Sequence, residues 1–519
     1  MKNIFGKFLA LAAGVFALSS CNLDRFPEAT RPYDGKDPYF QKASDVSASE
    51  VTVYTTFRGV LDTYLTDIML QGFNAAVGYG NDLGQVHRTD ATFNASNDAV
   101  EGVWGSHYRA MVQYNVIIAA ADHPNTLESD FAEHAQFVKA EALVARAYSY
   151  IQLARHFGLR YNKETADKDL CVPYVVVYDQ SARPSRATNA QIYGLIEEDL
   201  STARQIFSLE SSKKYLTENQ ACAEYFTLDV ITALEARYLL DTQRYKEAAA
   251  KAGELVKCGR YSLSTSLEDL IKVQSEGKGT EAIMQLYADK TEGLVGYGRF
   301  TDYGQNEKSP TKYAYVPKYL PSQVLIDAYT EPSDLRRQAW LEQPSDPIYL
   351  SASFHTGINL FVKYKGDASL VSSGLQEGVV AAKPFMISEM YLIAAEASLA
   401  AGNQVDADFY LNALQSDRKA STTTATSETL YNEWFRETVG EGLFFFYLKR
   451  NNKGFSGREG QEKAKTENLL YTSPAGSEVD YYEGRELPAD HRAFNFPIPT
   501  YEIQCNRNLV QNPGYGDNN

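Results

Sequence analysis

The chain has 519 residues, of which 44% are hydrophobic and 22% charged, so its composition is globular and its length suggests about three domain-sized units. Its formal net charge of −16 argues against a nucleic-acid partner, because phosphate binding needs a basic surface. Tyrosine is in excess, with 36 Tyr against 3 Trp, and a ring with a polar tip suits wet binding surfaces as well as cores.

The first residues predict an export signal over residues 1–20. Lys2 and Lys7 precede and flank an apolar run of 11 residues, "FLALAAGVFAL", which is too short to span a membrane comfortably. The tetrapeptide "LSSC" that ends at Cys21 resembles a bacterial lipobox, in which the cysteine is acylated and becomes the mature N-terminus. The alternative is a plain signal peptide that Cys21 follows by chance. No later segment reaches 18 apolar residues, so we expect any membrane anchor to be this lipid.

Residues 21–50 are rich in Pro, Asp and Gly and predict a lipid anchor with a tether, whereas residues 51–265 predict an N-terminal helical region. Within that region the apolar spacing predicts helices in the segments 104–123, 135–158, 187–207 and 225–263. The stretch "LLDTQRYKEAAAKAGEL" looks like the helix-turn-helix junction of a tetratricopeptide repeat, with Tyr245 packing and Ala248 at the close contact.

The residue pattern changes over residues 266–380. These residues predict a loop-rich insertion of short β-like runs, with a helical period only near Gln323–Tyr329. Residues 381–519 predict a second helical hairpin, through "MYLIAAEASLAAGNQVDADFYLNAL", followed by an irregular tail. The predicted fold class is therefore mainly α, with tetratricopeptide-like helical hairpins as a scaffold for an insertion that contains short β-strands.

Signatures of catalysis and metal binding are missing from the sequence. It contains no H-E-x-x-H, G-x-S-x-G, Walker A or dinucleotide motif, so we predict no catalytic residues, no metal ligands and no cofactor, with a structural Ca²⁺ left open. The remaining cysteines form no C-x-x-C pair and are expected to be buried small hydrophobes, with one chance disulfide possible: Cys171, Cys222, Cys258 and Cys505.

Two aromatic segments are candidate ligand-binding surfaces, because flat rings cover the apolar faces of sugars or peptide side chains while nearby polar groups bind hydroxyls or amides. The first lies in the insertion and offers Tyr297, Arg299, Phe300, Tyr303, Tyr313, Tyr315 and Trp340. The second is the Gly-flanked loop "AVGYGNDLGQVHRTD", which offers Tyr79, Asn81 and Asp82. The alternative is that half or more of these rings only pack the insertion against the helices.

Several ordered landmarks resemble the SusD/RagB family of outer-membrane nutrient-uptake lipoproteins. After the lipobox and the early helix "WGSHYRAMVQYNVII", the helix "AEALVARAYSYIQLARHFG" looks like a family motif through Glu141, Arg146, Ala147, Tyr150, Leu153, Phe157 and Gly158. "RPSRATNAQIYGLIEEDLSTA" is similar to the next family segment through Ile196, Asp199, Leu200 and Ala203. "FMISEMYLIAAEASL" and "FPIPTYEIQCNRNLVQNPGY" resemble the late helix and the tail. One departure is "GEGLFFFYLKRNN", where Phe444 and Tyr447 replace an Arg and an Asp of the family pattern.

The resemblance implies a lipoprotein of the cell outer membrane, held by Cys21 and facing the extracellular side. Such a protein caps a SusC-like TonB-dependent transporter as a hinged lid, captures an oligosaccharide or a peptide, and delivers it without being an enzyme. Two alternatives remain: a surface lipoprotein that hydrolyses glycans, and a tetratricopeptide-type adaptor that binds only proteins. The family's ligand residues vary in type, so the ligand-binding candidates above depend on aromatic and polar clustering alone.

Overall fold

The computed structural model describes residues 39–516 apart from 62–64, 79–82, 123–128, 278, 292–294, 297, 307–308, 372–377 and 472–484. The predicted signal peptide and Cys21 therefore lie outside the described residues. Helix α2 begins at Ala43, inside the segment predicted as a tether. Its start is stabilised by Asp45, whose Oδ2 accepts hydrogen bonds from the backbone N–H groups of Gln41 (3.0 Å) and Lys42 (3.1 Å).

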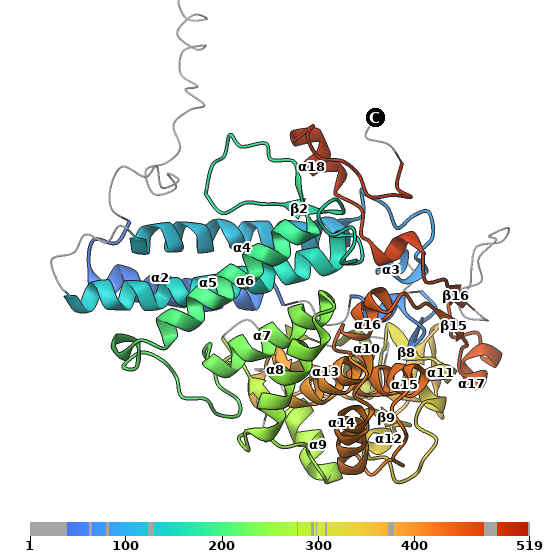
Figure 1. Ribbon diagram of the computed structural model, residues 1–519. Coiled ribbons are helices and arrows are strands. Elements are labelled where there is room, and N and C mark those ends of the chain that lie inside the picture. Colours follow the sequence, from blue (N-terminus) through green and yellow to red (C-terminus); the bar gives the residue numbers. More distant parts are fainter. Residues whose placement is uncertain are drawn as a thin grey trace, which may run out of the picture.

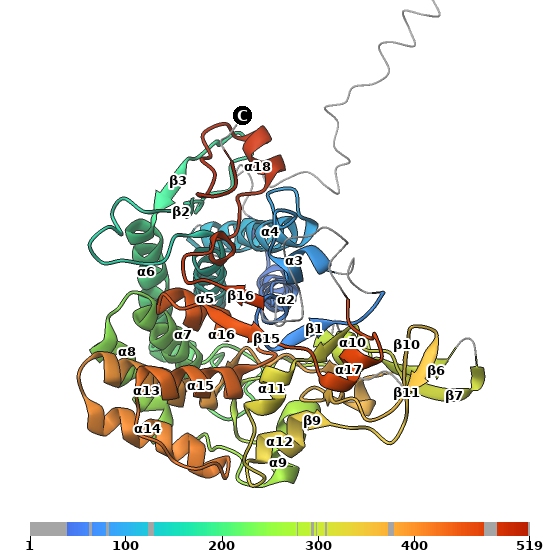
Figure 2. The ribbon, with the colours of Figure 1, turned by 90° about the vertical axis from the view of Figure 1, so that its right-hand side faces the viewer.

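The N-terminal half is a bundle of long helices, seen lengthwise in Figure 1 and nearly end-on in Figure 2. Its elements are α2 (Ala43–Gly59), η2 (Asp67–Met69), β1 (Phe73–Ala75), α3 (Gly84–Arg88), α4 (Asp98–Asp122), α5 (Ser129–Phe157), β2 (Leu170–Pro173), β3 (Arg186–Thr188), α6 (Asn189–Phe207) and η3 (Glu210–Ser212). Thr188 caps α6 by accepting from the Gln191 backbone N–H. Two of the family-like residues meet here, because Arg146 of α5 donates from Nε and Nη2 to both carboxylate oxygens of Asp199 on α6 (2.8 and 2.7 Å).

Two helical hairpins lie below this bundle, α7–α8 and α13–α14 (Figure 1). Their helices are α7 (Leu228–Asp241), α8 (Tyr245–Lys257), α13 (Ile387–Ala400) and α14 (Gln404–Asp417), and α13 packs against both α8 and α14. The predicted junction is confirmed, since α8 begins at Tyr245 and Ala248 is fully buried. Gly253 allows the closest approach, because a Cβ there would lie 2.5 Å from the hydroxyl oxygen of Tyr410 on α14.

The insertion between the hairpins consists of short helices and short strands. They are α9 (Leu267–Ser275), β4 (Ala282–Met284), β5 (Val295–Gly296), α10 (Gly298–Thr301), β6 (Tyr303–Asn306), β7 (Ser309–Tyr315), β8 (Tyr319–Pro321), α11 (Gln323–Asp327), α12 (Leu335–Trp340), β9 (Leu341–Glu342), β10 (Ile348–Leu350), β11 (Ser353–His355), β12 (Leu360–Phe361), η4 (Ala368–Leu370), β13 (Val379–Val380) and β14 (Phe385–Met386). The expected helix near Gln323 is confirmed, whereas α9 and α12 were not expected; they have only nine and six residues.

Most strands form antiparallel pairs, and one sheet has four strands in the order β11-β10-β7-β6, with β10 parallel to β7 and the other pairs antiparallel. The pair β1-β8 connects the N-terminal half to the insertion, β14-β4 joins the two ends of the insertion, and β15-β16 lies within the C-terminal part. The C-terminal elements are α15 (Ser427–Thr438), α16 (Phe444–Arg450), β15 (Phe455–Arg458), α17 (Glu462–Thr466), β16 (Arg485–Leu487), η5 (Arg492–Phe494) and α18 (Thr500–Cys505). The predicted fold class is confirmed: a mainly helical scaffold carries an insertion of short strands.

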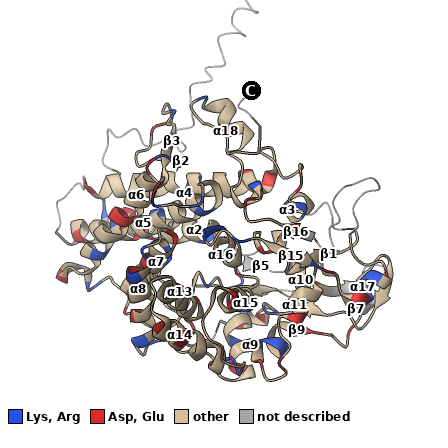
Figure 3. Cartoon of the chain, turned by 45° about the vertical axis from the view of Figure 1, so that its right-hand side comes forward, with Lys and Arg blue, Asp and Glu red and all other residues tan. Residues whose placement is uncertain are grey.

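The cysteine prediction was partly wrong. All four described cysteines are free, so they form no disulfide with one another, but only Cys171 is buried. Cys222 and Cys258 are half-buried, and Cys505 is exposed because it ends α18 at the surface of the C-terminal tail. Acidic and basic residues are interspersed over the scaffold (Figure 3). No helix in the described part of the chain is both long and apolar enough to cross a membrane.

Candidate ligand-binding surface

The four-stranded sheet, here called the tyrosine sheet, brings three of the predicted residues together. Tyr303 on β6 lies opposite Tyr315 on β7, and Tyr313 is two residues away, so all three side chains lie on one face. The ring centroids of Tyr303 and Tyr313 are 6.0 Å apart with an interplanar angle of 20°, and those of Tyr303 and Tyr315 are 4.6 Å apart at 51°. Figure 2 places this sheet at the outer end of the insertion.

The three rings differ in what they offer a ligand. Tyr315 is buried in a small second core with Ile348 and Leu350, whereas 41% of the Tyr313 residue surface is exposed. Tyr303 packs on the same core, and its hydroxyl donates to Oδ2 of Asp346 at 2.7 Å. The arrangement is an aromatic row with a buried end, an exposed end and a carboxylate beside its middle ring.

Sequence reasoning missed a second aromatic pair on this sheet. Tyr349 of β10 lies opposite Phe354 of β11, with ring centroids 5.0 Å apart, and Phe354 is 36% exposed. Because Tyr349 follows Ile348, which lies opposite Tyr315, this pair is on the other face. The signal was the alternation in "PIYLSASFH", which places aromatic and aliphatic residues on opposite faces of a hairpin.

The second predicted patch, Tyr79, Asn81 and Asp82, lies outside the described residues, as does Tyr297. The residues just before this segment contact the second core: Ala76 is buried there with Tyr315, and the Val77 N–H donates to the Leu469 carbonyl at 2.8 Å. The two segments that the sequence singled out are therefore anchored to the same small core, although more than 200 residues separate them.

Two predicted ligand residues are core residues in this structure. Phe300 on α10 is 1% exposed and packs on Phe73 and Phe361, with centroids 4.6 and 5.4 Å away. Trp340 is also 1% exposed, and the Nζ of Lys363 lies 4.0 Å from its ring centroid. Neither ring is accessible to a ligand at the described surface, so the packing alternative holds for both. Arg299 lies on α10, and its side chain is outside the described part.

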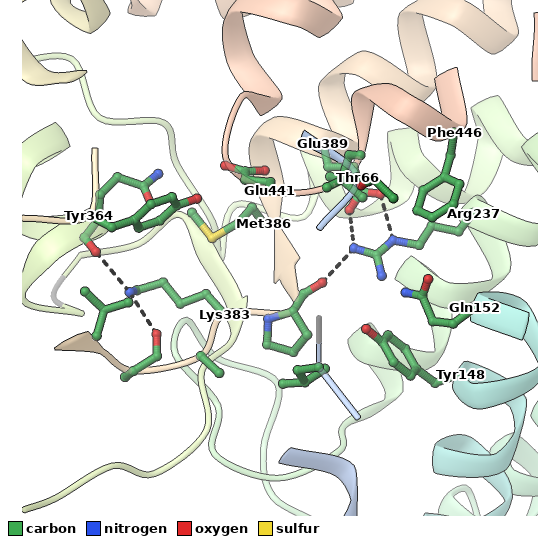
Figure 4. A pocket seen from close by; sticks show the side chains of 18 of the residues that line it. Thr66, Tyr148, Gln152, Arg237, Tyr364, Lys383, Met386, Glu389, Glu441 and Phe446 are labelled. Atoms are coloured by element: carbon green, nitrogen blue, oxygen red, sulfur yellow. Dashed lines mark hydrogen bonds and ion pairs between the residues drawn. The ribbon is translucent and has the colours of Figure 1, made fainter. Parts of the chain in front are cut away.

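A partly open pocket of about 70 Å³ lies where α5, α7 and α13 meet the segment 380–386 (Figure 4). Arg237 dominates it, donating from Nε and Nη2 to Glu389 (2.7 and 2.6 Å) and from Nη2 to the Pro384 carbonyl (2.6 Å). Lys383 also lines it, and burial lowers the pKa of this lysine to about 8. A cavity that binds benzene has a volume of about 150 Å³, so this smaller space suits a few water molecules rather than a sugar. We interpret it as a polar contact region between the helical bundle and the two hairpins.

The described residues include no group of three or more His, Cys, Asp or Glu side chains arranged to hold a metal ion. Histidines are used structurally: His87 Nδ1 lies 2.6 Å from the Ile68 carbonyl, and His355 Nδ1 lies 2.6 Å from Oε2 of Glu467.

Comparison with known proteins identifies the fold. Residues 46–232 match a family model described as starch-binding and associating with the outer membrane, and residues 382–515 match the SusD family model. The chain belongs to the SusD/RagB family. No curated protein matches the sequence.

Solved structures of the SusD superfamily agree over most of the chain. A SusD superfamily protein from Bacteroides thetaiotaomicron is 24% identical, with a TM-score of 0.72, and the match covers 91% of this chain and 100% of that one. Surface glycan-binding protein A from Bacteroides fluxus is 20% identical, with a TM-score of 0.66 and the same coverage. A laminarin-binding SusD-like protein is 18% identical, with a TM-score of 0.63, covering 92% of this chain and 100% of that one. At these identities the likeness concerns the fold.

Proposed function

We propose that this SusD/RagB member is a surface nutrient-binding lipoprotein that captures an oligosaccharide at the tyrosine sheet. The observation that carries the proposal is the aromatic row itself: Tyr313 is exposed, and Tyr303 is held beside it by Asp346. An exposed ring can cover the apolar face of a pyranose, and a neighbouring carboxylate can accept from its hydroxyls. The glycan-binding proteins among the similar structures favour a glycan over a peptide.

The proposal includes delivery without turnover. Captured glycan would pass to a SusC-like TonB-dependent transporter, over which this chain acts as a lid. Acylated Cys21 would hold the chain to the outer membrane, with the ligand-binding surface facing outward. Hydrolysis would need two carboxylates placed on either side of a glycosidic bond. Beside the described tyrosine rings, the carboxylate of Asp346 accepts a hydrogen bond from the Tyr303 hydroxyl.

The test is calorimetric titration of the purified protein with neutral oligosaccharides and with peptides. We expect saturable glycan binding without product formation, and at least a tenfold loss of affinity in the double variant Tyr303→Ala/Tyr313→Ala. Tyr501→Ala is the matched control, because Tyr501 is 60% exposed on α18, far from the sheet (Figure 2). Unchanged affinity in the double variant would refute the assignment to this sheet, and binding of peptides alone would refute the glycan.

A further inference from the structure

A second candidate site lies in an open groove of about 760 Å³ between α11 and α15, which shares no lining residue with the tyrosine sheet. One face of α15 lines it with Glu428, Tyr431 and Phe435, which recur at three- and four-residue steps. Asp327 at the end of α11 lines the opposite wall, and Phe455 of β15 forms part of the floor. Figure 2 shows the two helices side by side below β15. The volume is in the range of small-molecule sites, about 300–1,000 Å³.

The groove contains polar groups whose hydrogen-bonding capacity is not used. Gln71, which is 2% exposed, donates from Nε2 to the Tyr431 hydroxyl at 3.1 Å. Its Oε1 is buried and has no donor among the described residues. The Tyr431 hydroxyl in turn is 3.5 Å from the Gly454 carbonyl oxygen, well beyond the usual O–H···O distance of about 2.8 Å. Buried polar atoms are nearly always paired, so the unpaired Gln71 Oε1 is unusual, and the Tyr431 hydroxyl is a donor engaged only by the long contact with Gly454.

The rest of the groove is rich in acceptors over an apolar floor. Phe435 and Phe455 are buried beneath it, whereas the exposed side chains of Glu428 and Asn432 make no hydrogen bond within the described part of the chain. Within the described part of the chain, the Asp327 side chain accepts one hydrogen bond, from Gln323 Nε2 at 2.8 Å. A ligand that matches these features has an apolar face and several O–H donors. The two carboxylates disfavour uronic acids and sulfated sugars, because like charges repel.

We infer that this groove is a second binding site for a neutral sugar, separate from the tyrosine sheet. The Tyr431 hydroxyl donates to a sugar oxygen, and sugar hydroxyls donate to the carboxylates of Glu428 and Asp327. Two sites on one chain hold a long glycan at two points, which raises the effective concentration at the second site once the first is occupied. The groove would therefore retain a polymer while the tyrosine sheet engages another segment of it.

The test uses purified protein and neutral hexasaccharides of glucose, xylose and mannose, titrated by calorimetry. In the Tyr303→Ala/Tyr313→Ala background we expect residual sugar binding, which Tyr431→Phe weakens at least fivefold by removing one hydroxyl. Tyr501→Phe in the same background is the control and should leave binding unchanged.

Each outcome decides between the two sites. Loss of all sugar binding in the Tyr303→Ala/Tyr313→Ala variant would overturn the inference of a second site in the groove. The same conclusion follows if Tyr431→Phe has no effect, or if the wild-type protein binds none of these sugars. If Tyr431→Phe weakens binding while the sheet variant does not, the groove stands and the tyrosine sheet fails as the capture site. Peptides that compete at Tyr431 where sugars do not would overturn the sugar assignment.

Discussion

Replacing Arg336 by alanine should lower the free energy of unfolding by about 3–5 kcal/mol, because it removes the centre of a buried ion-pair network. Arg336 is 0% exposed and comes from α12 in the insertion. Its Nη1 donates to Glu433 (2.5 Å) and Glu437 (3.0 Å) on α15, and its Nε and Nη2 donate to Asp334 (3.0 and 2.8 Å). The guanidinium therefore joins the insertion to the C-terminal helices.

The magnitude follows from what each carboxylate retains. Glu433 keeps Arg436 and Gln415, and Glu437 keeps Arg418, which donates from Nη2 at 2.6 Å. Four charge-assisted hydrogen bonds at about 1.5–3 kcal/mol each would sum to more than about 5 kcal/mol. The actual cost is smaller, because Arg436, Gln415 and Arg418 still neutralise or hydrogen-bond the two glutamates. The cost then approaches the range of about 3–5 kcal/mol measured when one partner of a buried pair is removed.

The same network predicts how the effect depends on pH. Burial alone would raise the pKa of Glu437, but Arg418 and Arg336 lower it to about 2. A carboxylate whose folded pKa lies below its unfolded value stabilises the fold above that unfolded value, 4.5, and this stability is lost as the pH falls toward 2. The destabilisation by Arg336→Ala should therefore be largest near neutral pH and smaller at pH 3.

Urea unfolding followed by tryptophan fluorescence measures the change, since Trp340 and Trp434 lie on the two helices that Arg336 connects. Arg337→Ala is the matched control on the same helix. Because Arg337 is exposed, this substitution should lower the free energy of unfolding by less than about 0.5 kcal/mol. If Arg336→Ala lowers the free energy of unfolding by less than about 1 kcal/mol, Arg336 is not the centre of a stabilising network.

Three further predictions concern separate features. Gly440 has φ +82°, and a Cβ there would lie about 3.0 Å from Phe361, so Gly440→Ala should cost about 2–4 kcal/mol by thermal unfolding. Gly402→Ala is its control, with φ +80° and open space, and should cost only about 1–2 kcal/mol. Burial lowers the pKa of His107 from 6.5 to about 3, so stability from its neutral form is lost as the pH falls below 6.5. His107→Leu should therefore reduce the slope of the free energy of unfolding with pH, measured by urea titrations from pH 6.5 to 4, by about 1 kcal/mol per pH unit. Cys21→Ala should move the protein from the membrane fraction to the soluble fraction on cell fractionation, and an unchanged distribution would contradict the lipid anchor.

The helical scaffold was predicted well, because the segments that form α4, α5 and the α7–α8 and α13–α14 hairpins are long, apolar and rich in good helix formers. It could not predict which motif residues meet. Arg146 and Asp199 stood in two separate motifs, and only packing of α5 on α6 shows that they form one ion pair. The tail motif is similar: Asn512 donates from Nδ2 to the carbonyls of Phe157 and Phe496, both at 2.7 Å, which holds the C-terminal tail to the end of α5.

The ligand-binding surface was predictable in part. Residue type alone cannot distinguish a ring that binds from a ring that packs, so Tyr313 and Trp340 looked equivalent in the sequence. The structure separates them, since Tyr313 is 41% exposed on one face of a sheet and Trp340 is 1% exposed beneath Lys363. The groove at Tyr431 was invisible, because its walls come from Gln71, α11, α15 and β15, which only the tertiary fold brings together.

The most direct test of capture at the tyrosine sheet is a crystal structure of the protein with a bound oligosaccharide from the titrations. The account predicts a sugar ring stacked on Tyr313, with a hydroxyl within hydrogen-bonding distance of Asp346. A bound oligosaccharide that leaves Tyr303 and Tyr313 uncovered would contradict it.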